Sequence, residues 1–83
     1  MKITVKYFAS IREAIGVANE TLDTDATSLG LLRDELIAMG GPHAQCLARG
    51  RAVRMAVNQM MSDDSVVLLD GAEVAFFPPV TGG

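Results

Sequence analysis

Regular alternation of apolar and polar residues opens the chain and constrains its fold more than any other feature. Over residues 2–8, Ile3, Val5 and Tyr7 alternate with two lysines and a threonine, until Phe8 breaks the polar face. A period of two is typical of a strand with one buried face. Further strands are predicted around residues 20–23, near 53–57 and over 73–77. The chain therefore builds a sheet, one face of which must be covered.

Two segments between the strands have the signals of helices that could cover it. Ser10 and Glu13 have the spacing of a capping box, and Gly16 is placed to end the short helix that they predict. Thr27 or Ser28 is expected to cap a longer helix. The apolar side of this longer helix is predicted to consist of Leu29, Leu32, Leu36 and Met39.

Glycine and proline divide the second half of the chain. The run Gly40–Pro42 is expected to end the longer helix, and residues 44–48 are expected to add one helical turn. Asn58 and Gln59 begin a turn that leads to a short edge segment at Met60 and Met61. The apolar stretch 66–69 ends in the turn signal Asp70, Gly71.

This order of elements predicts an α+β fold, a sheet covered by helices on one face. A chain of 83 residues is long enough for a single core, so we expect one domain over residues 1–77, followed by an extended tail over residues 78–83.

Charge and composition exclude several classes of partner. The net charge is −3 and no cluster of basic residues is present, so nucleic acid is not an expected partner. No apolar run approaches the roughly 18 residues that span a bilayer, so no membrane insertion is expected. Cys46 has no second cysteine to pair with, and the first residues do not form a signal peptide. We therefore expect a soluble cytoplasmic protein.

Side chains that could form a complete active site are missing from the sequence. His43 is the only histidine, so no zinc site is predicted, and a loop or cap position is its expected role. Cys46 lies among apolar neighbours and is expected to be a buried thiol. The acidic residues lie mainly in polar or turn segments, where carboxylates are usually solvated.

The end of the chain is the strongest candidate for chemistry. Gly82 and Gly83 lack a Cβ, so they can enter a narrow site that excludes bulkier residues, and the reacting group would be the α-carboxylate of Gly83. The alternative is a frayed terminus. Because glycine makes up about 7% of average sequences, two random final positions would both be glycine only about 0.5% of the time.

The segment DGAEVAFFPPVTGG at residues 70–83 closely resembles the MoaD/ThiS family of sulfur carriers, and within it the small subunits of molybdopterin synthase. The opening KITVKYFASIREAIG and the AVNQ at residues 56–59 resemble the same family. The resemblance implies a ubiquitin-like β-grasp fold with a mixed sheet, in which the last strand pairs with the first.

The resemblance also implies a route for sulfur. An activating enzyme would use ATP to adenylate Gly83, and sulfur would then replace AMP to leave a thiocarboxylate. The large subunit of molybdopterin synthase would accept this tail and transfer the sulfur to cyclic pyranopterin monophosphate, forming the dithiolene of molybdopterin. This chain would bind no cofactor or metal itself, and its partners would supply the catalytic side chains.

An apolar surface beside the tail is expected to bind these partners. Phe76 and Phe77 should point to opposite faces of their strand, with Phe77 exposed. The other residues of the expected partner surface are Phe8, Met61, Pro78, Pro79, Val80 and Thr81.

One departure from the family pattern is Ala72, where an acid is common, and it leaves one acidic contact with the activating enzyme in doubt. Three alternatives stay open beside the molybdopterin carrier. They are a carrier of the thiamine pathway, a ubiquitin-like modifier joined to lysines through Gly83, and a passive interaction module with an inert tail.

Overall fold

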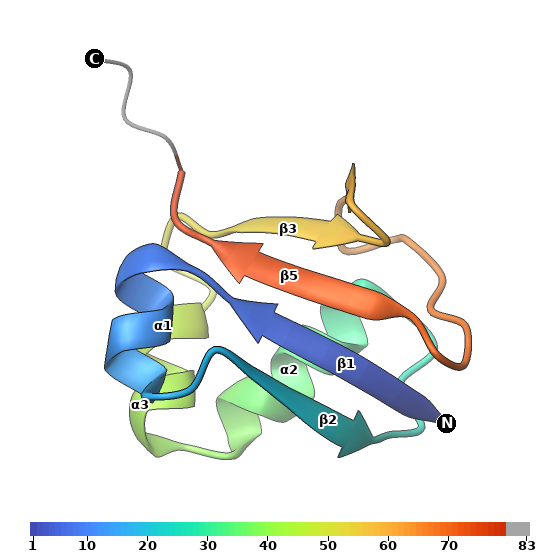
Figure 1. Ribbon diagram of the computed structural model, residues 1–83, viewed down its shortest axis with the longest axis horizontal. Coiled ribbons are helices and arrows are strands. Elements are labelled where there is room, and N and C mark those ends of the chain that lie inside the picture. Colours follow the sequence, from blue (N-terminus) through green and yellow to red (C-terminus); the bar gives the residue numbers. More distant parts are fainter. Residues whose placement is uncertain (80–83) are drawn as a thin grey trace.

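A mixed sheet of five strands forms the frame of the part that the computed structural model describes, residues 1–79 (Figure 1). The order across the sheet is β2-β1-β5-β3-β4, with β1 and β5 parallel and the other neighbours antiparallel. The strands are β1 (Lys2–Tyr7), β2 (Asn19–Asp23), β3 (Arg54–Val57), β4 (Met60–Met61) and β5 (Glu73–Phe77).

The first and last strands lie side by side in the middle of this sheet, as the family resemblance implied. Val5 pairs with Val74, and Tyr7 pairs with Phe76. All four side chains are buried, on the face of the sheet that the helices cover. Burial of large apolar side chains from both strands therefore fixes the register of this central pair.

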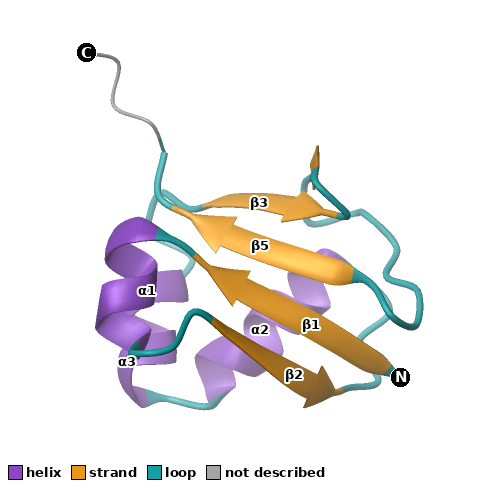
Figure 2. Ribbon diagram, viewed as in Figure 1, coloured by secondary structure: helices purple, strands orange, loops and turns teal. Residues whose placement is uncertain are grey.

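Three helices within residues 1–79 pack on one face of the sheet, and the other face is left open (Figure 2). They are α1 (Ala9–Ile15), α2 (Leu29–Ala38) and α3 (Gly41–Leu47). Ser28 caps α2, because its side chain accepts a hydrogen bond from the Leu31 N–H. Gly16 ends α1 in the left-handed conformation, at φ 94°, and its N–H donates to the Arg12 carbonyl.

Two expectations about the helices are wrong. Ser10 and Glu13 form no capping box, because α1 begins two residues earlier than a Ser10 cap would place it. Its N-cap is Phe8, which makes no side-chain cap bond. The Phe8 N–H instead donates to the Phe76 carbonyl, so the sheet holds this residue in an extended conformation. Met39 does not belong to the buried side of α2, since it lies past the last core residue, Leu36, and is 55% exposed.

The third helix begins earlier than the single turn expected at residues 44–48. Gly40 has a φ of 76° and reverses the chain after α2, and Pro42 lies in the first turn of α3. Proline is tolerated there because the first N–H groups of a helix have no partner within it. The run Gly40–Pro42 thus ends one helix and starts the next.

His43 lies inside α3 and not at a loop or cap position. Its Nε2 donates to Glu20 Oε2 over 2.8 Å, and the buried Tyr7 hydroxyl donates to the same oxygen over 2.7 Å. An ionised carboxylate can only accept, so the proton of this bond belongs to the imidazole. The cluster joins α3 to β2 and β1 through one carboxylate.

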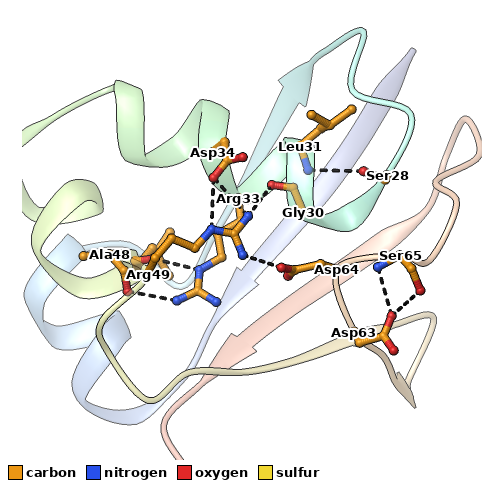
Figure 3. Close-up of polar contacts among 11 residues, drawn as sticks. Ser28, Gly30, Leu31, Arg33, Asp34, Ala48, Arg49, Asp63, Asp64 and Ser65 are labelled. Atoms are coloured by element: carbon orange, nitrogen blue, oxygen red, sulfur yellow. Dashed lines mark hydrogen bonds and ion pairs between the residues drawn. The ribbon is translucent and has the colours of Figure 1, made fainter.

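Two arginines hold the segment between α3 and β3, residues 48–53, against α2 through hydrogen bonds (Figure 3). Arg33 is buried in α2 and donates to the carbonyls of Leu47 and Ala48, at the end of α3. Arg49 donates to the carboxylates of Asp34 and Asp64. Carbonyls at a helix end lack partners in the helix, so Arg33 satisfies groups that would otherwise be buried without one.

A close approach of two backbones explains Gly30, which the sequence gave no reason to single out. The Gly30 N–H donates to the Asp64 carbonyl over 3.0 Å, and its own carbonyl accepts from Arg49. A Cβ added at this position would lie 2.9 Å from the Cβ of Asp64. The start of α2 and the loop around Asp64 can therefore meet only at a glycine.

Gly30→Ala should destabilise the protein by about 1–3 kcal/mol, because overpacking outweighs the higher helix propensity of alanine. Gly50→Ala is the matched control, since nothing lies within 4 Å of a Cβ at that position. Urea unfolding of the two variants checks this. A Gly30→Ala variant as stable as Gly50→Ala would show that the contact with Asp64 relaxes freely.

Glu20 should make stability depend on acid pH. Burial raises the pKa of Glu20, but the hydrogen bonds from His43 and Tyr7 lower it more, so that it lies below its ordinary value of 4.5. The stability contributed by the ionised group is complete above the ordinary pKa and is lost as the pH falls through the folded-state pKa.

Glu20→Gln should therefore lower the free energy of unfolding by about 1–3 kcal/mol at neutral pH. The difference from the wild type should shrink as the pH falls below 4.5 and through the lowered folded-state pKa, because the wild-type carboxylate then becomes protonated. Glu13→Gln, an exposed change on α1, is the control and should show no such trend. A constant difference at all pH values would exclude the ionised state of Glu20 as the cause.

Candidate functional site

The end of β5, where the predicted reactive tail leaves the sheet, is the candidate site. Successive phenylalanines point to opposite faces there, as the alternation predicts. Phe76 is fully buried, and its ring stacks on Tyr7 with centroids 6.3 Å apart. Phe77 lies on the open face, but it is half-buried and not fully exposed as expected.

Phe8 explains the partial burial of Phe77. The two rings meet edge to face, with centroids 6.4 Å apart. Phe8 directly follows β1 and is 46% exposed. Two of the predicted partner residues are thus in contact where the tail begins.

Met61 shares the open face with these rings but does not stack on them. It pairs with Ala56 of β3, which in turn pairs with Ala75 of β5, and residues paired across strands point to the same face. Met61 is 60% exposed. We define the open-face patch as Phe8, Met61, Ala75 and Phe77, since Ala56 is only 7% exposed.

A charged pair borders the open-face patch, and the sequence alone did not suggest it. Lys6 and Glu73 form an ion pair at 3.1 Å, with both side chains partly exposed. The Glu73 backbone is held by Asn58, whose side chain accepts from the Glu73 N–H over 3.0 Å. Asn58 has a φ of 50°, a conformation that asparagine tolerates in turns. Only the pairing of β1 with β5 makes the Lys6–Glu73 contact visible.

Two prolines form the root of the tail, Pro78 and Pro79, and both are half-buried. Pro78 lines a depression with Ile11 of α1 and with Cys46 of α3. Pro79 lines a larger depression between β3 and the loop 61–65. The first two residues after the sheet are therefore seated on the domain.

Val80, Thr81, Gly82 and Gly83 lie outside the described residues. Their predicted roles, including that of the Gly83 carboxylate, stay predictions.

The other candidate groups of the described residues are buried or are bound by neighbouring side chains. Cys46 is buried, as expected. Hydrogen bonds from Ser65 hold the pKa of the exposed Asp63 below its ordinary value, and Asp64 is bound by Arg49. Within residues 1–79 no group of three or more His, Cys, Asp or Glu side chains could hold a metal ion. In the same range no helix has the length and apolar character needed to cross a bilayer.

Ala72, the departure from the family pattern, is buried. It is 4% exposed, and its carbonyl accepts a hydrogen bond from the Thr4 N–H over 3.0 Å. The side chain at this position faces the core in this protein. The small alanine side chain is accommodated in the core at this position, so it offers almost no surface to a partner.

The sequence of almost the whole chain is similar to those of known proteins and of a known family. Residues 5–83 match the ThiS family. A protein of Escherichia coli K12 named "Molybdopterin synthase sulfur carrier subunit" is 40% identical over 81 residues, which cover 98% of this chain and 99% of that protein.

Solved structures resemble the fold over its whole length. SAMP1 from Haloferax volcanii superposes with a TM-score of 0.79 at 24% identity, covering 100% of both chains. A chain from a complex of subunits 1 and 2 of molybdopterin-converting factor from Helicobacter pylori gives a TM-score of 0.71 at 27% identity, again covering 100% of both. At 24% identity, the likeness to SAMP1 establishes that the chain has the β-grasp fold but says nothing about its function.

The opposite orientations of the two phenylalanines predict different costs of truncation. Phe76→Ala should destabilise the protein by about 3–5 kcal/mol, because it leaves a cavity in the core. Phe77→Ala should cost well under half as much, since Phe77 is only half-buried and its ring meets that of Phe8 on the open face. Thermal or urea unfolding checks the order, and equal losses would contradict the assignment of faces.

Proposed function

The chain belongs to the ThiS family, and from this membership we propose that it is the sulfur-carrier small subunit of molybdopterin synthase. The observation that carries the proposal is its 40% identity, over almost the full length of both chains, to the E. coli protein of that name. The family resemblance noted in the sequence is confirmed by the match over residues 5–83. The sulfur serves the synthesis of the molybdenum cofactor.

The reacting group in this proposal is the carboxylate of Gly83. An α-carboxylate has a pKa of about 3.3–3.7, so it is ionised at neutral pH and is a poor electrophile. Attack of one of its oxygens on the α-phosphate of ATP, in the activating enzyme, forms an acyl adenylate and releases pyrophosphate. A sulfur nucleophile at the oxidation level of sulfide then attacks the acyl carbon, AMP leaves with the electron pair of the broken C–O bond, and a thiocarboxylate results.

The large subunit of molybdopterin synthase then accepts the loaded tail. Sulfur passes to cyclic pyranopterin monophosphate, and since a dithiolene holds two sulfur atoms, two loaded chains are consumed for each product. This chain binds neither the nucleotide nor the pterin by itself. Its partners supply the catalytic side chains, and ATP is used by the activating enzyme.

The described residues set where the tail starts and therefore how far it can reach. The six residues 78–83 span at most about 20 Å when extended. Because Pro78 and Pro79 are seated on the domain, the four residues after Pro79 have a reach of at most about 14 Å. Gly82 and Gly83 keep the tip slim, and proline lowers the entropy lost when a tail becomes ordered.

The open-face patch is the proposed contact surface for both partners. Phe8, Met61 and Phe77 offer apolar area next to the tail, in keeping with interfaces in which apolar residues form the centre. The same surface would serve the large subunit and the activating enzyme in turn, because each must receive the same tail.

A ubiquitin-like modifier is the second candidate function, because the small archaeal modifier SAMP1 has the same fold. At 24% identity that likeness concerns the fold alone. A modifier would be recovered in isopeptide bonds to lysines, without passing through a thiocarboxylate. A carrier of the thiamine pathway would be loaded in the same way but would not support dithiolene formation.

Removing Gly83, or adding one residue after it, should abolish dithiolene formation in a mixture of the large subunit, the activating enzyme, ATP and a sulfur source. In either variant the terminal carboxylate is shifted by one residue along the tail, so it no longer reaches the reacting position in the activating enzyme or in the large subunit. Thermal unfolding should be unchanged, because β5, the last strand of the described sheet, already ends at Phe77. Full activity of either variant would refute the proposed mechanism.

A further inference from the structure

Two exposed arginines stand on either side of the tail root. Arg51 lines the depression that holds Pro78, and Arg54 lines the one that holds Pro79. Arg54 is also directly opposite Phe77 in the pairing of β3 with β5. Figure 1 shows the start of β3 beside the end of β5, where the tail leaves the sheet.

Neither arginine has a carboxylate within ion-pair distance in residues 1–79. Within the same range Lys2, Arg12 and Arg33 also lack one, but none of these three lines the depressions at the tail root. Lys6 pairs with Glu73, and Arg49 pairs with Asp34 and Asp64. Two acids, Asp63 and Asp64, line the same depression as Arg54, but both are engaged by other side chains. Asp63 accepts hydrogen bonds from Ser65, and Asp64 is bound by Arg49.

In a chain with a net charge of −3, two arginines without acidic partners are therefore concentrated at the base of the proposed reactive tail. We propose that Arg51 and Arg54 bind acidic side chains at the mouth of the channel through which the large subunit of molybdopterin synthase receives the tail. This inference rests on the proposed function. It adds that charge complementarity at the tail root contributes to recognition of the large subunit.

The length of the tail favours protein carboxylates over phosphate groups of a bound nucleotide or pterin. Those phosphates would lie near Gly83, at the tip. An inserted, extended tail of four residues places the tip about 14 Å from Pro79, beyond the roughly 4 Å at which an ion pair forms. The arginines at the root can thus meet only groups at the entrance of the channel.

The chemistry of the surroundings also fits a protein partner. A guanidinium binds a carboxylate through two parallel hydrogen bonds, which gives direction as well as attraction. Arg54 borders the open-face patch next to Phe77, an arrangement of charge around an apolar centre that is common in interfaces. Charges at such a rim mainly set the rate of association and the choice of partner.

The test compares the double variant R51E/R54E with K2E. Lys2 is an exposed cation at the start of β1, and β1 runs parallel to β5, so Lys2 is at the end of the sheet opposite to the tail. Binding to the large subunit would be followed by stopped-flow fluorescence at low and high salt. R51E/R54E should reduce the association rate constant at low salt by about tenfold, and high salt should narrow the difference.

The lysine variant R51K/R54K should keep most of the rate, because it keeps the charge. Circular dichroism would establish that every variant is folded. An unchanged rate in R51E/R54E, an equal loss in K2E, or a loss seen only with the activating enzyme would overturn the inference. Failure of the wild-type chain to bind the large subunit at all would instead refute the proposed function.

Discussion

The parallel pairing of β1 with β5 is the interaction on which the rest of the structure depends. Val5 and Tyr7 pack beside Val74 and Phe76 under the helices, so burial holds the two ends of the chain together in the middle of the sheet. The tail therefore starts from the most constrained part of the molecule. The same pairing brings Phe8 onto Phe77, on the face of the sheet that no helix covers.

Much of this frame could be predicted because it rests on local patterns. Alternation in residues 2–8 indicated β1, and the serine before the leucine-rich segment indicated the start of α2. The capping box failed because a hydrogen bond from Phe8 to Phe76, distant in sequence, holds the start of α1 differently. In this case a long-range contact overrides a local motif.

The polar clusters could not be predicted for a related reason. Tyr7, Glu20 and His43 come from three different elements, and Arg33 reaches carbonyls at the end of α3. Nothing in the spacing of these residues shows that they meet. At the candidate site, Phe8 and Met61 were predicted as partner residues from departures in the alternation, and Phe77 from the alternation itself. Lys6, Glu73, Arg51 and Arg54 needed the arrangement of the strands and of the tail root.

The fold by itself does not distinguish a carrier of sulfur from a modifier of proteins, since SAMP1 shares it closely. What distinguishes them is the fate of the terminal carboxylate. The most direct measurement is the intact mass of this chain after incubation with the activating enzyme, ATP and a sulfur source. Our account predicts a mass gain equal to the replacement of one oxygen by sulfur, localised to Gly83 by fragmentation. An adenylated chain that never gains sulfur, or a chain of unchanged mass, would contradict it.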